Sequence, residues 1–400
     1  MYRFFYKNNL LSKNQSGFRP GDSTINQLLS ITTDIYEAFE DYEEVRAVFL
    51  DISKAFDKVW HEGLIFKLEQ NGISGNLLGL LRNYLTNRKQ RVVINGITSE
   101  WETILSGVPQ GSVLGPLLFL IYINDLTDNI QSHMKLFADD SSLFLRVKDV
   151  DLAHNQLVID LDTITKWANQ WKMKFNPDIT KQAIEIIFSY KYKKETHPPL
   201  VFNGIPVARE SSTKHLGVVL DDRLSFRKHI QESIIKAKKG LALMKFLSKW
   251  VTSIILDKTY KLYVRPHLDY GDIIYHGQLI DMMNALESMQ YQAGLIVSKC
   301  WKGTSRQKLY NELGWENLSE RRVFRRFALY FKIKNNETPE YLREHICNLP
   351  NKRTLRYEKS FFPFCHLNWN NIKEEIRNAS NLQQFKKKYL KEIRPTIKSY

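Results

Sequence analysis

Two adjacent aspartates, Asp139 and Asp140, lie in the middle of an otherwise apolar stretch that runs from Met134 to Leu145. Asp and Ser are common in turns, and the apolar residues on either side have the character of short strands. The stretch therefore predicts a β-hairpin with both carboxylates at its tip. Unpaired like charges a few ångströms apart repel strongly, so the hairpin has to fold where these charges can be balanced.

A third aspartate, Asp51, ends an apolar strand expected over residues 47–51 and precedes an amphipathic helix expected over residues 53–59. A fold that places the two strand ends side by side gathers three carboxylates. Carboxylates and water are the ligands that Mg²⁺ prefers, and pairs of Mg²⁺ ions serve in-line phosphoryl transfer in polymerases and nucleases. Each part also has an ordinary explanation, because Asp is common in hairpin turns and often caps a helix after a strand.

The positive charge of the chain is concentrated in its second half. The net charge is +15; residues 1–200 contain 22 Lys and Arg against 24 Asp and Glu, and residues 201–400 contain 36 against 19. A basic region beside an acidic metal centre suits an enzyme that handles a polyanion. The alternative is a basic surface that only keeps the protein soluble.

The composition is that of a soluble globular protein, with 400 residues, 43% hydrophobic and 25% charged. The longest apolar run, residues 117–123, is far shorter than the roughly 20 residues of a membrane span, and the N-terminus lacks a signal peptide. The three cysteines are too widely spaced for a zinc site or a disulfide framework. We therefore predict no membrane association and an intracellular location, in the nucleus and cytoplasm.

Hydrophobic periodicity predicts strands and helices that alternate up to about residue 225, and basic helices after it. This order favours the α+β fold class. The expected elements are helices over 25–39, 64–85 (interrupted near 72–75), 116–125 and 157–171, hairpins with Asn-Gly turns over 91–98 and 200–207, and strands over 183–189 and 215–220.

Six segments with distinctive residues follow one another along the chain. They are Gln15-Ser16-Gly17-Phe18-Arg19-Pro20-Gly21, Phe49 to Asp57, Ser106 to Pro116 (with Val108-Pro109-Gln110-Gly111), Phe137-Ala138-Asp139-Asp140, a Trp167/Trp171 helix leading to Asn176 and Lys181, and His215 to Asp221. In this order they resemble the reverse transcriptase of non-LTR (LINE-type) retrotransposons, and the jockey-like group in particular. The Phe-Ala-Asp-Asp form is similar to the non-LTR branch rather than to retroviruses.

The resemblance implies an α+β, right-hand polymerase fold. Its expected regions are partial fingers over 1–45, a palm with an antiparallel sheet and inserted fingers elements over 46–225, a helical thumb over 226–300, and a basic helical C-terminal region over 301–400. The fingers are expected to be incomplete because the family's motifs begin almost at once, at Gln15.

The resemblance also assigns the metal ligands. Asp51, Asp139 and the backbone carbonyl of Ile52 are expected to bind two Mg²⁺ ions, with Mn²⁺ as a substitute. Asp140 is expected to tune this site more than to bind metal. Asp57 is expected to be structural, as a carboxylate on a helix face or at a cap.

Three further residues are expected at the incoming nucleotide. Phe56 resembles the bulky ring that excludes a ribose 2′-hydroxyl. The alternative is that Phe56 packs in the apolar core, as most aromatic residues do. Gln110 resembles a contact to nucleotide or template, and Gly111 permits close approach of the backbone. The alternative for both is a plain loop before a helix.

Two cations are expected at the triphosphate. Arg19 resembles the fingers arginine that pairs with phosphate oxygens. Lys181 resembles the lysine proposed to protonate pyrophosphate, with a solvated surface lysine as the alternative. Asp22 departs from the family pattern, since relatives carry Arg or His there, and it reduces the positive charge expected around the triphosphate.

His215, Leu216 and Gly217 resemble the primer-grip hairpin. His215 is expected to position backbone rather than bind metal, because no partner His or Cys lies near it in the sequence. Trp167 and Trp171, four residues apart on a helix, are expected to pack in the core and not to stack on bases.

Together these features predict an RNA-directed DNA polymerase that adds deoxynucleotides to a primer 3′-hydroxyl by a two-metal mechanism. Its expected partners are an RNA template, a DNA primer and dNTPs. One alternative is a decayed or domesticated remnant that binds nucleic acid without efficient polymerisation; the short N-terminal region favours it, and the three intact aspartates oppose it. Another is a metal-dependent nuclease, which fits the carboxylates but not Phe56, Gln110 or the primer grip.

Overall fold

The computed structural model of the chain describes residues 1–178, 182–192, 195–275, 277, 279–347 and 354–393. The chain divides into two compact units, which are described one at a time below. The first comprises Met1–Thr24 and Glu43–Ser211, and the second Ile25–Tyr42 and Ser212–Tyr400. The functional regions expected from the resemblance, with boundaries after 45, 225 and 300, stay predictions.

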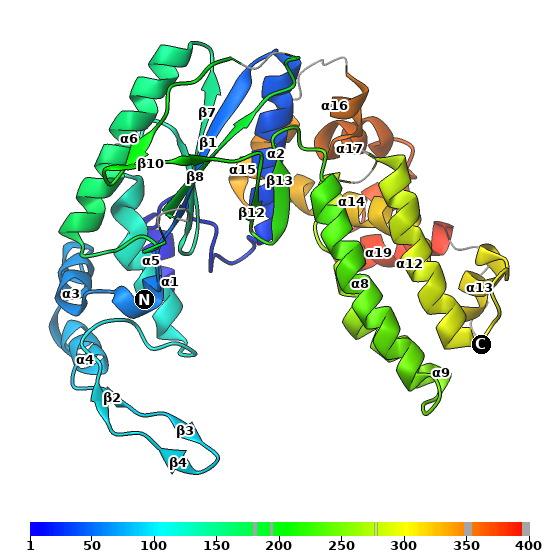
Figure 1. The fold of residues 1–400 in the computed structure, drawn as a ribbon, viewed down its shortest axis with the longest axis horizontal. Helices are drawn as coiled ribbons and strands as arrows, with labels where there is room; N and C mark the ends of the chain where they lie inside the picture. Colours follow the sequence, from blue (N-terminus) through cyan, green and yellow to red (C-terminus); the bar gives the residue numbers. More distant parts are fainter. Residues whose placement is uncertain (179–181, 193–194, 276, 278, 348–353, 394–400) are drawn as a thin grey trace. The chain divides into compact units, whose positions relative to one another are not determined.

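A five-stranded sheet forms the centre of the first unit, in the order β11-β8-β1-β7-β6 (Figure 1). Its strands are β1 (Glu44–Asp51), β6 (His133–Phe137), β7 (Asp140–Val147), β8 (Ala183–Phe188) and β11 (Ala208–Arg209). Neighbouring strands are antiparallel except β11, which runs parallel to β8. The α+β fold class with an antiparallel sheet, as expected from the sequence, is confirmed.

The helices of this unit bury their apolar residues in one core with the sheet. The helices are α1 (Tyr2–Lys7), α3 (His61–Gln70), α4 (Gly75–Leu85), α5 (Leu114–Ile123) and α6 (Val150–Gln170), with the 3₁₀ segments η1 (Ala55–Lys58) and η2 (Asn124–Thr127). Helix α5 is apolar on every side and is buried, as such a helix has to be. Helix α6 begins after Asp149, whose carboxylate accepts the backbone N–H of Leu152.

Short two-stranded pairs complete the first unit. They are β2 (Lys89–Gln90) with β5 (Glu102–Thr103), β3 (Val93–Ile94) with β4 (Ile97–Thr98), and β9 (Val201–Phe202) with β10 (Ile205–Pro206). The β3–β4 and β9–β10 pairs confirm both Asn-Gly hairpins. In each of them Asn and Gly both have positive φ, which is the conformation that such two-residue turns require.

The second unit is mainly helical. Apart from the first residue of α2, it contains α2 (Thr24–Glu40), β12 (Ser212–His215), β13 (Val218–Asp221), α8 (Arg227–Leu247), α9 (Ser253–Thr259), the π-helical η3 (Tyr260–Val264), α10 (Arg265–Asp269), α11 (Asp272–Tyr275), α12 (Ile280–Ser298), α13 (Arg306–Leu313), α14 (Leu318–Lys334), α15 (Glu340–Cys347), α16 (Leu355–Lys359), α17 (Phe361–Trp369), α18 (Glu374–Arg377) and α19 (Leu382–Ile393). Among the described helices, none has the length and apolar character that a membrane crossing requires.

Two local expectations are wrong. The helix expected over 53–59 is only the single 3₁₀ turn η1, because the Ser53 N–H bonds to the Lys174 carbonyl and Lys54 adopts a left-handed conformation. The single strand that periodicity predicts over 215–220 is instead a hairpin of β12 and β13, the local form that the resemblance implied for His215 to Gly217. Leu216 and Gly217 both have positive φ, so they reverse the chain in a two-residue turn.

Candidate active site

Strand pairing brings the predicted carboxylates together. Asp51, the last residue of β1, is directly opposite Asp140, the first residue of β7. Residues opposite each other on antiparallel strands project from the same face of a sheet. Asp139 lies in the turn between β6 and β7, immediately after Ala138, which has a positive φ of 55°. The expected hairpin with carboxylates at its tip is therefore present, at the end of the strand that carries Asp51.

The charges of these aspartates disfavour one another. Desolvation by the surrounding protein, followed by repulsion from Asp139 and Asp51, raises the pKa of Asp140 to about 6. Burial also raises the pKa of Asp139, and Asp51 adds to the effect. Within the described part of the chain, none of the three takes part in an ion pair. Two carboxylates with raised pKa values, Asp139 and Asp140, together with the neighbouring Asp51, are a donor set that suits a divalent cation.

The three aspartates are not the tightest group of possible metal ligands. Over the described residues, one group has ligand atoms that all lie within 4.8 Å of one another, namely Asp34, Glu37 and His345 in the second unit. His345 lies within ion-pair distance of both carboxylates, at 3.8 Å and 3.9 Å, so these residues can also stabilise one another without a metal.

Asn176 orients Asp51. Its side-chain Nδ2 donates a hydrogen bond to Asp51 Oδ2 at 2.7 Å, and its backbone N–H donates to the Asp51 carbonyl at 2.9 Å. Together with the bond from Ser53 N–H to the Lys174 carbonyl, this forms an antiparallel bridge centred on Ile52 and Phe175. The two bonds flank Ile52, so this bridge does not use the Ile52 carbonyl that the resemblance assigns to a metal.

Gln15 holds the turn that carries Asp139. Its side-chain Oε1 accepts the backbone N–H groups of Gly17 at 2.7 Å and Ala138 at 2.9 Å, and its Nε2 donates to the Ala138 carbonyl at 3.4 Å. The side chain is only 5% exposed. The neighbouring Ser16 N–H donates to the Leu136 carbonyl at 2.8 Å. The segment around Gln15 therefore positions the carboxylate hairpin, a role that sequence reasoning missed although it noted the motif.

Phe56 lies in η1, and Gln110 and Gly111 lie in the loop before α5. The backbone N–H of Val108 donates to the Phe56 carbonyl at 2.9 Å, which joins the loop to η1. The half-buried Phe56 ring stacks on Phe119 with a centroid distance of 4.3 Å, so the aromatic is at least partly a packing residue. Gln110 Nε2 donates to Asp57 Oδ1 at 2.8 Å, and the helix-face or capping role expected for Asp57 stays a prediction.

The cations expected at the triphosphate and the two tryptophans remain to be placed. Arg19 is half-buried and its Nη1 donates to the Ser12 carbonyl at 3.4 Å. Lys181 lies outside the described residues. Trp167 and Trp171 are buried in the core, as expected.

The predicted primer-grip residues belong to the second unit. The Tyr270 hydroxyl donates to the Leu216 carbonyl at 2.5 Å. A Cβ added at Gly217 would lie only 2.9 Å from the Tyr270 ring, so the glycine allows this close contact. Tyr270 thus holds the turn of the β12–β13 hairpin. Burial lowers the pKa of His215 to about 4, so its imidazole is neutral at physiological pH.

Replacing Asp140 with asparagine should remove a pH-dependent loss of stability. Because the native pKa of Asp140 is raised from 3.8 to about 6, the native state holds this proton more tightly than the unfolded state does. Stability is therefore lost as the pH rises from about 4 to about 6. Without divalent cations, Asp140→Asn should raise the melting temperature at pH 7, by an amount that the solvent exposure of this side chain keeps small, and have little effect at pH 4. Equal shifts at both pH values would contradict the assigned repulsion.

The chain has clear relatives among known proteins. A family model described as reverse transcriptase (RNA-dependent DNA polymerase) matches residues 2–220. A probable RNA-directed DNA polymerase from transposon BS of Drosophila melanogaster is 29% identical over 322 residues, which is 78% of this chain and 35% of that protein.

Two further relatives also come from Drosophila transposons. The probable RNA-directed DNA polymerase from the X-element of Drosophila melanogaster is 29% identical and covers 72% of this chain and 32% of its own length. The RNA-directed DNA polymerase from the mobile element jockey of Drosophila funebris is 31% identical, over 66% of this chain and 30% of its own length. The chain spans about a third of the length of these relatives. The resemblance to jockey-like, non-LTR retrotransposons is confirmed, and the chain belongs to the reverse transcriptase family.

Proposed function

We propose that the chain is an RNA-directed DNA polymerase that adds deoxynucleotides to the 3′-hydroxyl of a primer. The observation that carries the proposal is the register of β1 and β7, which sets Asp51 opposite Asp140 beside the turn that holds Asp139. A family match over residues 2–220 supports the same assignment. The nucleic-acid partners are an RNA template and a DNA primer, and the substrates are dNTPs.

The aspartates and the Ile52 carbonyl would hold two Mg²⁺ ions, or Mn²⁺ in their place. When bound, such ions lower the pKa of the primer 3′-hydroxyl and neutralise the triphosphate and the departing pyrophosphate. Asn176 keeps the Asp51 carboxylate oriented through its 2.7 Å hydrogen bond. Gln15 fixes the backbone of Ala138 and, through it, the position of Asp139.

Other residues would bind the substrates. Arg19 would pair with triphosphate oxygens, and Lys181 would donate a proton to pyrophosphate. Gln110 and Gly111 would contact the nucleotide or template. The hairpin of His215, Leu216 and Gly217 would position the primer backbone, and the basic second half of the chain would grip phosphates without sequence preference.

One assay separates this function from its alternatives. The chain is incubated with Mg²⁺, dNTPs and a labelled primer annealed to an RNA or a DNA template. Extension on the RNA template supports the proposal. Salt-sensitive binding without extension would instead indicate a nucleic-acid-binding remnant, and shortening of either strand would indicate a nuclease.

Replacing Phe56 with valine should relax the choice between deoxynucleotides and ribonucleotides. If the ring occupies the space of a 2′-hydroxyl, its removal opens that space, and selectivity built on exclusion is lost. The ratio of dNTP to NTP incorporation should fall at least about tenfold, or by about 1.4 kcal/mol of discrimination. Phe66→Val, at a half-exposed ring on α3, is the matched control and should leave the ratio unchanged. An unchanged ratio in Phe56→Val would restrict Phe56 to its packing against Phe119.

A further inference from the structure

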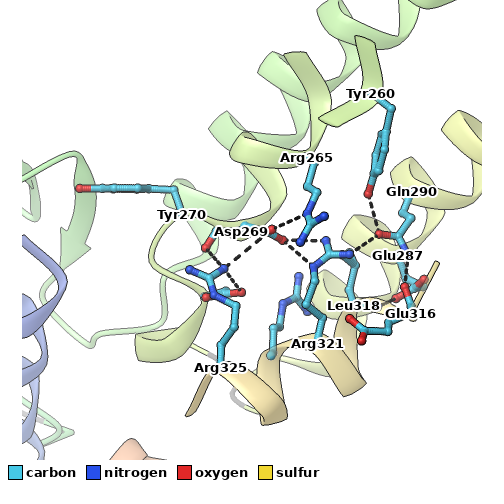
Figure 2. Close-up of polar contacts among 12 residues, drawn as sticks. Tyr260, Arg265, Asp269, Tyr270, Glu287, Gln290, Glu316, Leu318, Arg321 and Arg325 are labelled. Atoms are coloured by element: carbon cyan, nitrogen blue, oxygen red, sulfur yellow. Dashed lines mark hydrogen bonds and ion pairs between the residues drawn. The ribbon is translucent and has the colours of Figure 1, made fainter. Parts of the chain in front are cut away.

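Helix α14 carries four buried or half-buried arginines, and two of them are matched by carboxylates. Arg321 Nη2 lies 2.7 Å from Asp269 Oδ1, and Arg325 Nη1 lies 2.8 Å from Asp272 Oδ2. Figure 2 shows this layer, in which Arg265 also reaches Asp269. Residues four apart share one face of a helix, so Arg321 and Arg325 form a face with its charges paired.

Arg322 lies on the adjacent face of α14. Among the described residues, it has no carboxylate partner within ion-pair distance. The residue is 1% exposed, and its buried Nε and Nη2 have no hydrogen-bond partner among the described residues. Its Nη1 lies 3.1 Å from the thioether sulfur of Met283, which is a weak acceptor. The nearby Asp272 Oδ1 likewise has no hydrogen-bond partner within the described part of the chain. A buried cation in this state is unfavourable, because its desolvation is not repaid by hydrogen bonds.

Arg322 lines a cavity of about 750 Å³ within the second unit. Three more basic residues line it, namely the exposed Arg306, the half-buried Lys359 and the buried Arg326. Arg326 is held by the carbonyls of Ile273 and Lys359, each at 3.0 Å, and so forms a fixed part of the wall.

The rest of the lining combines one acidic side chain with aromatic rings. Among the described lining residues, Glu287 is the one carboxylate, and it is already bound by the Tyr310 hydroxyl at 2.7 Å and the Leu318 N–H at 2.8 Å. Figure 2 shows Glu287 directed toward Leu318. Tyr310 and Phe364 line the same cavity. The cavity is thus positively charged, partly aromatic, and within the size range of small-molecule sites.

We infer that this cavity binds a nucleoside monophosphate unit, either as a free nucleotide or as one residue of a single-stranded nucleic acid. Arg306 and Lys359 supply accessible contacts to the phosphate, and Arg322 supplies a buried charge behind them. Phosphate is the anion that several guanidinium groups suit best, and the half-buried Phe364 ring at the cavity wall can contact a base without regard to sequence. The inference goes beyond polymerisation and does not depend on it, since none of these residues is assigned to the aspartate site.

Calorimetric titration of the full chain with AMP, adenosine and inorganic phosphate tests the inference. AMP should bind, adenosine should bind at least tenfold more weakly, and phosphate should compete with AMP. A single-stranded oligonucleotide without terminal phosphates distinguishes the two sources of the nucleotide. Competition with AMP supports a polymer ligand, and its absence supports a free nucleotide. Failure of AMP to bind, or equal binding of adenosine, would overturn the inference.

Two exposed basic residues on α13 provide a matched pair of variants. Arg306 lines the cavity and Lys308 does not. Arg306→Gln should weaken AMP binding at least tenfold, and Lys308→Gln, with the same change in charge, should leave it unchanged. Equal effects would show that only the general charge of the surface matters, which contradicts a defined site.

The variant Arg322→Met distinguishes a role of Arg322 in AMP binding from a role in stabilising the fold. Methionine keeps a long apolar stem beside Met283 and removes the buried charge, so the melting temperature should stay the same or rise. AMP binding should fall at least tenfold. A lower melting temperature together with unchanged AMP binding would show that Arg322 serves only the fold. If this variant does not fold, the α13 pair still decides the question.

Discussion

Replacing Asp51 or Asp139 with asparagine should lower nucleotide addition on an RNA template by at least about 100-fold, the loss typical when one electrostatic stabiliser of a transition state is removed. The physical reason is that asparagine keeps the size of the side chain but lacks the charge that would hold a divalent cation. The fold should persist, because Asp51 is exposed and Asp139 is half-buried and neither forms part of the apolar core. Single-turnover addition of one dNTP measures the effect.

A surface aspartate controls for the loss of a negative charge. Asp162 on α6 is exposed and pairs with Lys166 one helical turn away, and such pairs contribute little. Asp162→Asn should therefore add nucleotides at the wild-type rate. Near wild-type addition by both Asp51→Asn and Asp139→Asn would remove these residues from the chemistry.

Replacing Gly17 with alanine should disturb the aspartate site, although Gly17 is not one of the aspartates. A Cβ at this position would lie 2.3 Å from the backbone nitrogen of Ala138 and 2.9 Å from Gln15 Oε1. Since real Cβ atoms do not approach so closely, the turn that carries Asp139 or the Gln15 segment has to move. Gly17→Ala should lower nucleotide addition at least about tenfold and destabilise the fold by about 1–3 kcal/mol, as overpacking usually does.

Gly79 provides the matched control for this substitution. It lies on the exposed part of α4, and a Cβ there would meet nothing within 4 Å. Gly79→Ala should leave nucleotide addition unchanged and stabilise the fold by up to about 1 kcal/mol, because alanine favours a helix over glycine. Wild-type activity and stability in Gly17→Ala would mean that the Gln15 segment can shift without moving Asp139.

Local sequence patterns predicted the carboxylate hairpin well. Its apolar strands and its turn are encoded within a dozen residues, so Asp139 and Asp140 could be placed at the tip without knowledge of the rest of the chain. The juxtaposition with Asp51 was an expectation about tertiary structure, and the register of β1 and β7 agrees with it. The assignment of these aspartates to metal ions stays a prediction.

Contacts between distant residues escaped prediction. The bond from Ala138 N–H to Gln15 joins residues 123 positions apart, and the bond from Asn176 to Asp51 joins residues 125 apart. Neither amide carries a charge or a periodic signal, and sequence does not distinguish an amide that binds a distant part of the chain from one that faces water. The only signal was that both lie within segments that resemble the family.

The backbone conformation of single residues explains the two wrong elements. Apolar spacing over 53–59 favoured a helix, but the Ser53 N–H bonds to the Lys174 carbonyl beside the isolated Ile52–Phe175 bridge, and Lys54 adopts a left-handed conformation in the turn that follows. Likewise, Leu216 adopts a positive φ that leucine rarely does, so the turn within 215–220 had no local signal besides Gly217. For the arginines of α14, the sequence shows the charges but not which of them meet a carboxylate.

Single-turnover addition of one complementary dNTP to a primer on an RNA template, followed as Mg²⁺ is titrated, tests the central claim most directly. If the three aspartates form a metal-dependent polymerase site, addition should be absent without divalent cations and rise to saturation with Mg²⁺. Asp139→Asn should show at most about 1% of that rate at any Mg²⁺ concentration. Addition that does not depend on Mg²⁺, or that persists undiminished in Asp139→Asn, would contradict the claim.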